Sequence, residues 1–189
     1  LLAGMALSAV CGAFSSFIVY FANNKEGMQT IAYWMMGSLA GAQWGELAVI
    51  APIIVASILF FWTQSRVLNL MLLGDESAIT MGTDLHAYRQ WYLLISSLIV
   101  GFAVYSAGMI GFVGLIVPHV IRMFTGPDHK RLLPVAALVG AIFLVVADGL
   151  CRVIIPHTEL PIGILISMIG APSFIYLMIK KTYGFGGSD

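Results

Sequence analysis

Long apolar stretches, separated by short polar connections, dominate this chain. A helix that crosses the hydrocarbon of a bilayer needs about 20 mostly apolar residues. Five stretches approach or meet that length: Leu1–Ala22, Trp44–Trp62, Trp91–Tyr105 with its continuation, Pro134–Cys151 and Ile162–Ile179. The pattern therefore predicts an all-α fold, a polytopic membrane bundle of transmembrane helices.

The third stretch is too long for one membrane crossing. Trp91–Phe124 is apolar almost throughout, and as one helix it would extend about 50 Å at 1.5 Å per residue. Gly108, Gly111 and Gly114 mark a place where the chain could reverse tightly. We therefore expect two spans here, the second of them short, which brings the expected number of transmembrane helices to about six.

Composition agrees with a membrane protein. Hydrophobic residues make up 60% of the chain and charged residues only 10%, whereas a soluble domain carries about 25% charged residues. The net charge of zero argues against nucleic acid as a partner. Cys11 and Cys151 lie in apolar stretches without metal-ligand spacing, and we interpret both as small core residues. Residues 1–189 are expected to form a single transmembrane domain.

Basic residues predict the orientation, because cytoplasmic connections carry an excess of Lys and Arg. We place Leu1 on the cytoplasmic side, where the chain begins inside an apolar run, as part of a longer protein would. The outer connections then hold two basic residues, Lys25 and Arg152. The inner connections and tail hold seven: Arg66, Arg89, Arg122, Lys130, Arg131, Lys180 and Lys181.

Three prolines, Pro52, Pro118 and Pro172, fall inside predicted spans. Proline removes a backbone donor and bends a helix, which membrane bundles tolerate when neighbouring groups satisfy the freed carbonyl. We expect a kink at each of these positions.

Small residues recur at four-residue spacing in the first span, at Gly4, Ser8, Gly12 and Ser16. Such a stripe lets helices approach closely. It indicates ordinary helix packing or, alternatively, the lining of a central pathway or subunit interface.

One polar connection, between Trp62 and Trp91, is long enough to hold structure of its own. Residues 74–76 have the acidic character of a helix start, and 77–81 would form a short helix. Gly82 would end it, because glycine tolerates positive φ. A second short helix would extend from Thr83 to Tyr88. Such a protrusion (72–88) suits force transfer from a partner, and the alternative is a solvated loop.

Several motifs in this chain resemble the FecCD family of ATP-binding-cassette (ABC) permeases, which import iron–siderophore chelates, haem and cobalamin. The motifs are "LLAGMALSAV", "YWMMGSLAGAQW", "QSRVLNLMLLGDESA", "GFVGLIVPHVIR", "GPDHKRLLP", "LVVADGLCR" and "ELPIGILISMIGAPSFIYLM". They cover nearly the whole chain in the family's order. Members of this family of type II importers have ten transmembrane helices per subunit, and this chain resembles the last six.

The resemblance implies partners. Family members work in the cytoplasmic membrane as paired permeases, usually homodimers, with two copies of a separate ATPase and an extracytoplasmic substrate-binding protein. The chain agrees in lacking a GxxxxGK[ST] phosphate loop, so we expect no enzyme activity and no directly bound cofactor or metal. The residues that match the family's ATPase-coupling helices are Gly74, Asp75, Glu76, Ser77, Ala78 and Gly82.

Arg152 stands at the outer end of a predicted span, four residues after Asp148. An i,i+4 ion pair between them would be structural. The resemblance implies instead that this arginine meets acidic residues of the binding protein, and both interpretations stay open.

Two other classes of function compete with this interpretation. An intramembrane metal-dependent enzyme could use His119 or Asp148, but no HExxH or paired-carboxylate motif accompanies them; we interpret His119 as a hydrogen-bonding group near the interface. A secondary transporter driven by an ion gradient would need a carboxylate at mid-depth, whereas Asp148 lies near a span's end. An importer of metal chelates, with iron–siderophore as the first expectation and alternating access as the mechanism, fits the residues better.

Overall fold

The computed structural model describes residues 2–21, 25–74, 78, 80–82, 85–154 and 160–184. Every element longer than one turn in this part of the chain is a helix. The elements are α1 (Leu2–Phe21), α2 (Lys25–Met36), α3 (Trp44–Thr63), α4 (Ser65–Leu73), α6 (Leu85–Ala107), α7 (Val113–Thr125), α8 (His129–Ile154) and α9 (Ile162–Gly184). The all-α bundle predicted from the apolar pattern is confirmed.

The six predicted spans correspond to six of these helices. Four helices are long and apolar enough to cross a membrane: α1, α3, α6 and α8. Two shorter apolar helices, α7 and the stretch Ile162–Tyr176 of α9, account for the other two predictions. Helix α7 would extend only about 20 Å at 1.5 Å per residue, less than the ~30 Å thickness of the hydrocarbon.

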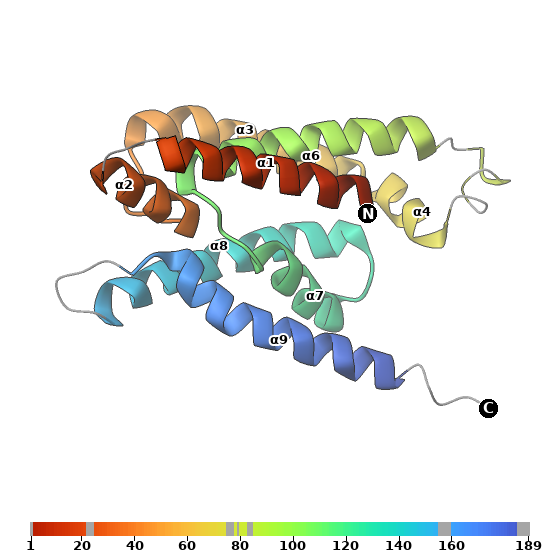
Figure 1. Ribbon diagram of the computed structural model, residues 1–189. Helices are drawn as coiled ribbons and strands as arrows, with labels where there is room; N and C mark the ends of the chain where they lie inside the picture. Colours follow the sequence, from red (N-terminus) through yellow and green to blue (C-terminus); the bar gives the residue numbers. More distant parts are fainter. Residues whose placement is uncertain are drawn as a thin grey trace.

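The helices run back and forth between two ends of the molecule (Figure 1). At one end, here called the inner end, lie the start of α1, helix α4, the start of α6 and the α7–α8 turn. At the other, the outer end, lie α2, the α6–α7 connection and the start of α9. The basic residues Arg66, Arg89, Lys130 and Arg131 belong to segments of the inner end. This division agrees with the predicted orientation.

The long third stretch does reverse where its glycines predicted. Helix α6 ends at Ala107, and Gly108 (φ 70°) and Phe112 (φ 64°) both adopt positive φ before α7 begins. Gly108 takes this conformation without the steric penalty that a side chain brings. Phe112 caps the new helix, since its carbonyl accepts the N–H of Ile116 at 2.9 Å. Gly114, the third glycine of the prediction, lies inside α7.

Helix α2 is an addition to the predicted elements, because the sequence interpretation treats Lys25 as part of an outer connection. The segment Lys25–Met36 contains good helix formers and places Met28, Ile31 and Met35 at three- to four-residue spacing. It ends at Gly37, which has φ 74°. The amphipathic spacing was the available signal, but the segment is too short and too polar for a span.

The packed core lies between α7, α8 and α9. One buried cluster joins Ala147, Cys151, Ile162 and Ile166, and a second joins Val117, Ile121 and Leu132. Helix α8 is the centre of the bundle, since it packs against α3, α4, α7 and α9. The burial of Cys151 confirms its interpretation as a core residue.

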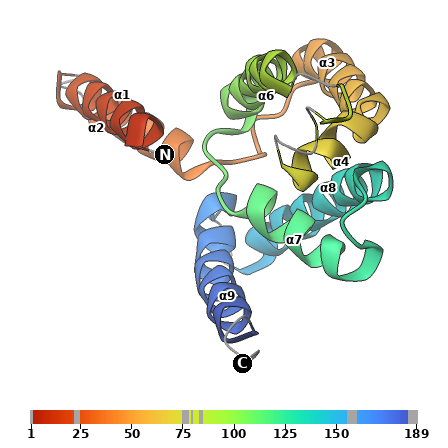
Figure 2. The same ribbon diagram turned by 90° about the vertical axis from the view of Figure 1, so that its right-hand side faces the viewer.

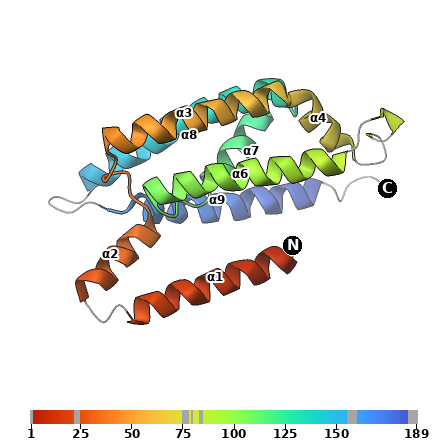
Figure 3. The same ribbon diagram turned by 90° about the horizontal axis from the view of Figure 1, so that it is seen from above.

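Helix α1 stands apart from the other long helices (Figures 2 and 3), and among the described residues its main packing partner is α2. The interpretation of Cys11 as a core residue is therefore wrong for this structure, where Cys11 is exposed. The stripe of Gly4, Ser8, Gly12 and Ser16 is exposed as well. Its role in packing or in lining a pathway stays a prediction.

The three prolines lie inside helices, as expected. Pro52 is in α3, Pro118 in α7 and Pro172 in α9, and each helix continues past its proline. The kinks themselves stay predictions.

Candidate functional site

The predicted coupling segment lies at the inner end, between α4 and α6. Gly74 ends α4 with φ 91°, and its carbonyl accepts the N–H of Ala78 at 3.2 Å. Ala78 is fully buried and helical, and Gly82 adopts φ 76° in a turn. The predicted stop at Gly82 is thus confirmed. Three members of the predicted set, Asp75, Glu76 and Ser77, lie outside the described residues.

The second short helix of the prediction is not a separate element. From Leu85 the chain enters α6 and continues without a break to Ala107, so the residues through Tyr88 are the first turn of a long helix. The expectation of two independent short helices needs this correction. The physical reason is that His86–Tyr92 carries neither glycine nor proline, so nothing ends the helix before the apolar stretch begins.

A polar network lies beside the coupling segment and joins α4 to the α7–α8 turn. The side-chain amide of Asn69 donates to Asp128 Oδ1 at 2.8 Å, and its Oδ1 accepts the backbone N–H of His129 at 2.9 Å. Asp128 Oδ1 also accepts the backbone N–H of Lys130 at 3.0 Å. The Asn69 amide first, and then the Lys130 N–H, lower the pKa of Asp128, because both stabilise its charged form.

Two further hydrogen bonds hold the same end of the molecule together. Trp62, near the end of α3, donates from its indole Nε1 to the carbonyl of Lys130 at 3.0 Å. The hydroxyl of Tyr92 on α6 donates to Oε1 of Gln64, which separates α3 from α4, at 3.2 Å. Helices α3, α4, α6 and α8 are therefore all connected at the inner end by side chains that are distant in sequence.

At the outer end, Arg152 and Asp148 form the predicted ion pair. Arg152 Nε lies 2.8 Å from Asp148 Oδ2, one helical turn away on α8. The arginine side chain is 48% exposed, so the pair is accessible from outside and the guanidinium presents a surface to a partner. Its contribution to stability is small, since exposed ion pairs contribute about 0–1 kcal/mol.

Three glycines at the outer end lie closely against other segments of the chain. A β-carbon on Gly108 would overlap the carbonyl oxygen of Trp34, and one on Gly163 would overlap that of Met36. One on Gly37 would lie 2.9 Å from Ile110 Cγ1. The end of α2, the α6–α7 connection and the start of α9 can meet here only because these positions lack side chains.

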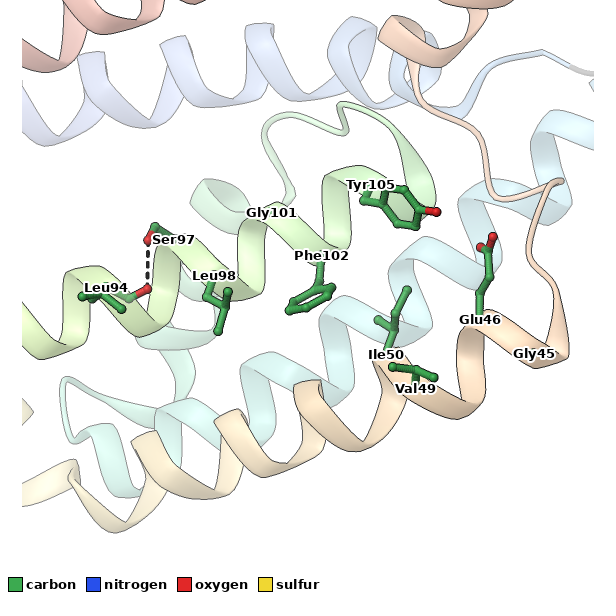
Figure 4. Close-up of a pocket in the computed structure, with 10 residues that line it drawn as sticks. All are labelled: Gly45, Glu46, Val49, Ile50, Leu94, Ser97, Leu98, Gly101, Phe102 and Tyr105. Carbon is green, nitrogen blue, oxygen red and sulfur yellow. Dashed lines mark hydrogen bonds between the residues drawn. The ribbon is translucent and has the colours of Figure 1, made fainter.

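A groove of about 820 Å³ runs between α3 and α6 (Figure 4). Its walls are apolar, with Val49 and Ile50 on α3 and Leu98 and Phe102 on α6. Glu46 brings a carboxylate to its outer end. Small residues also line it, at Gly45, Ser97 and Gly101. Such a surface suits the packing of an apolar helix.

His119 lies in a cavity of about 350 Å³ between α7 and α8, which Arg122 and His129 also line. The sequence alone places His129 in a loop beyond this helix, whereas it is the first residue of α8. The fold thus brings two histidines to one cavity. The described residues contain no group of three or more metal-ligating side chains.

Comparison with known proteins agrees with these features. The sequence pattern of the FecCD transport family matches residues 1–180. The hemin transport system permease protein HmuU of Yersinia pestis is 41% identical over 96% of this chain and 54% of its own length. The cobalamin import system permease protein BtuC of Halobacterium salinarum is 42% identical over 94% of this chain and 47% of its own length.

A solved structure gives the same result for the fold. It is described as an inward-facing conformation of a metal-chelate type ABC transporter, and it matches 95% of this chain with a TM-score of 0.88 at 35% identity. The match covers 58% of that structure's chain. This chain therefore spans about half the length of the curated relatives that it matches.

Proposed function

The chain belongs to the FecCD transport family, and from this premise we propose that it is the C-terminal part of a permease subunit of an ABC importer. The family places it in the cytoplasmic membrane as a multi-pass transport component, not an enzyme. The proposed cargo is a metal chelate: an iron–siderophore, haem or cobalamin. The relatives named above transport hemin and cobalamin. An iron–siderophore is the finer proposal and comes from the family resemblance.

One observation supports this proposal most strongly. The segment that resembles the family's coupling helices lies at the basic, inner end of the bundle, where a cytoplasmic ATPase would meet it. Two glycines with positive φ, Gly74 and Gly82, bound the described part of this segment between α4 and α6. Hydrogen bonds from neighbouring helices fix α4 in place.

The proposed mechanism is alternating access. A loaded binding protein would dock at the outer end, where Arg152 offers a half-exposed cation to acidic side chains. Closure of two ATPase subunits would displace the coupling segment, and the bundle would then reopen on the other side. The complete importer would contain a second permease copy, and the Gly4–Ser16 stripe of α1 would face the pathway or that copy.

The test uses the full-length permease, its ATPase and its binding protein in proteoliposomes. We expect Glu76→Gln and Gly82→Ala to reduce ATP-dependent uptake and the substrate-stimulated part of ATP hydrolysis, with membrane insertion unchanged. Gly82 has φ 76°, and an alanine there costs about 1–2 kcal/mol of strain. Gly149→Ala is a matched control, because Gly149 is helical and has no heavy atom within contact distance of an added β-carbon. Normal coupled rates in both coupling variants would remove the assignment.

Uptake assays also address the competing class and the cargo. An ion-gradient transporter would continue to work in vesicles that lack the ATPase, whereas the proposed importer would not. Labelled ferric siderophore, haem and cobalamin, each offered with the binding protein, identify the chelate. Uptake that depends on an ion gradient and not on ATP would refute the importer.

A further inference from the structure

The network around Asn69 has a defined donor and acceptor at every position. The backbone N–H of His129 can only donate, so the Asn69 atom that faces it at 2.9 Å must be the oxygen. The carboxylate of Asp128 accepts, so the atom that faces it at 2.8 Å must be the amide nitrogen. His129 Nδ1 lies 2.8 Å from the same Asn69 oxygen and must therefore carry a proton.

These bonds hold the first turn of α8. Asp128 is the N-cap of that helix: its side chain accepts the N–H of Lys130, and its carbonyl accepts that of Leu132 at 2.9 Å. Asn69 therefore binds the carboxylate that caps α8, and it fixes the position at which α8 begins.

The positions of Asn69 and Asp128 let the network connect the coupling segment to helix α8. Asn69 lies on α4, five residues before Gly74 and the coupling segment. Helix α8 leads from Asp128 at the inner end to Asp148 and Arg152 at the outer end. It also packs against α3, α7 and α9 on the way. A displacement of α4 that is transmitted to α8 would thus reach most of the bundle.

Resting on the proposed function, we propose that Asn69 is a positioning residue for transport, which joins the coupling segment to helix α8 through the cap at Asp128. Helix α4 is only nine residues long, and Asn69 joins it by hydrogen bonds to the residues at which α8 begins. Without these bonds α4 keeps its packing against α8 but loses the directional contact, so movement of the coupling segment would bend α4 locally instead of being carried fully to α8.

The proposal is tested with Asn69→Leu, which keeps the size and removes both polar atoms, and with Asn69→Asp, which sets two carboxylates against each other. The double variant Asn69→Asp with Asp128→Asn exchanges the two side chains. It restores one donor and one acceptor across the contact, because the amide introduced at position 128 can donate to the carboxylate introduced at position 69. Asp128 Oδ1 makes both wild-type bonds, so that amide must turn until its nitrogen faces position 69 and its oxygen faces the Lys130 N–H. Thr63→Val is the control, since the Thr63 hydroxyl donates to the carbonyl of Phe60 within its own helix, at 2.7 Å, and has no other hydrogen bond among the described residues.

In proteoliposomes with the full transporter, we expect both single variants to keep basal ATP hydrolysis within about twofold of the wild type. Uptake and the stimulation of hydrolysis by loaded binding protein fall by about fivefold or more, the lower range of measured couplings. The exchanged pair recovers more than half of the lost coupling, and Thr63→Val behaves as the wild type. A role in stability alone would instead lower basal and stimulated hydrolysis in parallel with the amount of assembled complex, and this outcome overturns the proposal. Normal coupling in Asn69→Leu, or no recovery in the exchanged pair, overturns it as well.

A second measurement does not depend on transport. Hydrogen exchange of the full-length permease reports on the backbone N–H groups of His129 and Lys130. We expect their exchange to be about tenfold faster in Asn69→Leu, because the Asn69 acceptor is lost and the cap is released. If exchange at His129 and Lys130 is unchanged in Asn69→Leu, Asn69 does not hold the cap of α8. If the wild type shows no ATP-dependent uptake, the proposed function fails, while the exchange result still decides whether Asn69 holds the cap.

Discussion

Gly108→Ala tests how much of the fold depends on backbone contact at the outer end. Gly108 has φ 70°, and a β-carbon there would overlap the carbonyl oxygen of Trp34 and lie 2.9 Å from the Cα of Gly37. Both obstacles are backbone atoms, which cannot move aside as a flexible side chain can. The chain segments on either side are fixed in turn, because Ser38 N–H donates to the carbonyl of Ala107 at 2.9 Å.

The magnitude follows from two contributions. The left-handed conformation costs an alanine about 1–2 kcal/mol relative to glycine. Overpacking at a well-packed contact costs about 1–3 kcal/mol. The variant should therefore lose about 2–5 kcal/mol of unfolding free energy. For a domain of this size each kcal/mol corresponds to about 2–4 °C, so Tm should fall by at least about 4 °C.

Thermal unfolding of the full-length permease in detergent, followed by the loss of the monodisperse species, measures this shift. Gly149→Ala on α8 is the matched control, because nothing lies within 4 Å of its added β-carbon. Alanine there should leave Tm unchanged or raise it slightly, since it has the higher helix propensity. If Gly108→Ala melts like Gly149→Ala, the three glycine contacts do not hold the outer end together.

Three further predictions concern single interactions. Trp62→Phe removes the indole donor to the Lys130 carbonyl and should cost about 0.5–1.5 kcal/mol of unfolding free energy, which lowers Tm. The control Trp44→Phe, at an 89% exposed position, should melt as the wild type does. Equal Tm shifts in the two variants would contradict a stabilising role for the Trp62 hydrogen bond. The lowered pKa of Asp128 means that its stabilisation is present above the ordinary aspartate pKa, about 3.9, and is lost as the pH falls through the lowered value. Between about pH 5 and 3, Tm of the wild type should thus fall more steeply than Tm of Asp128→Asn. Parallel curves of Tm against pH would show that the Asp128 carboxylate does not stabilise the fold. Arg152→Ala should slow association of the binding protein and make the association rate less dependent on salt. Tm should change little, because the Asp148–Arg152 pair is exposed. If association at low and high salt matches the wild type, the ion pair has a structural role only.

The sequence was informative wherever the property is local. Apolar stretches of membrane-spanning length located the four helices long enough to cross a membrane and the two shorter apolar helices, since lipid demands apolar side chains over about 20 residues whatever their neighbours are. Gly108 marked a chain reversal and Gly82 a helix end, because positive φ favours glycine at the level of the single residue. The Asp148–Arg152 pair followed from helical spacing alone.

Predictions failed where a boundary depends on length or context. Helix α2 is too short and polar to be recognised as a span, and the proposed second short helix proved to be the start of α6. Helix ends depend on small differences in helix propensity, and the packing of a following apolar helix can outweigh these differences. Cys11, on the isolated helix α1, and Cys151, in the core, look alike in sequence and differ in burial.

By itself, the sequence determined that this is a membrane bundle, which end of it carries the basic residues, and which family it resembles, because all three are sums over local composition and motif. Only the tertiary structure decided that Asn69 meets Asp128 across 59 residues and that Trp62 meets Lys130. It also decided that Gly37, Gly108 and Gly163 each lie closely against another segment at the outer end. The type of a residue tells which hydrogen bonds an amide or indole can make, and how closely another segment can approach a glycine. Which partner it meets depends on how helices far apart in the chain pack against each other, and no local pattern encodes that.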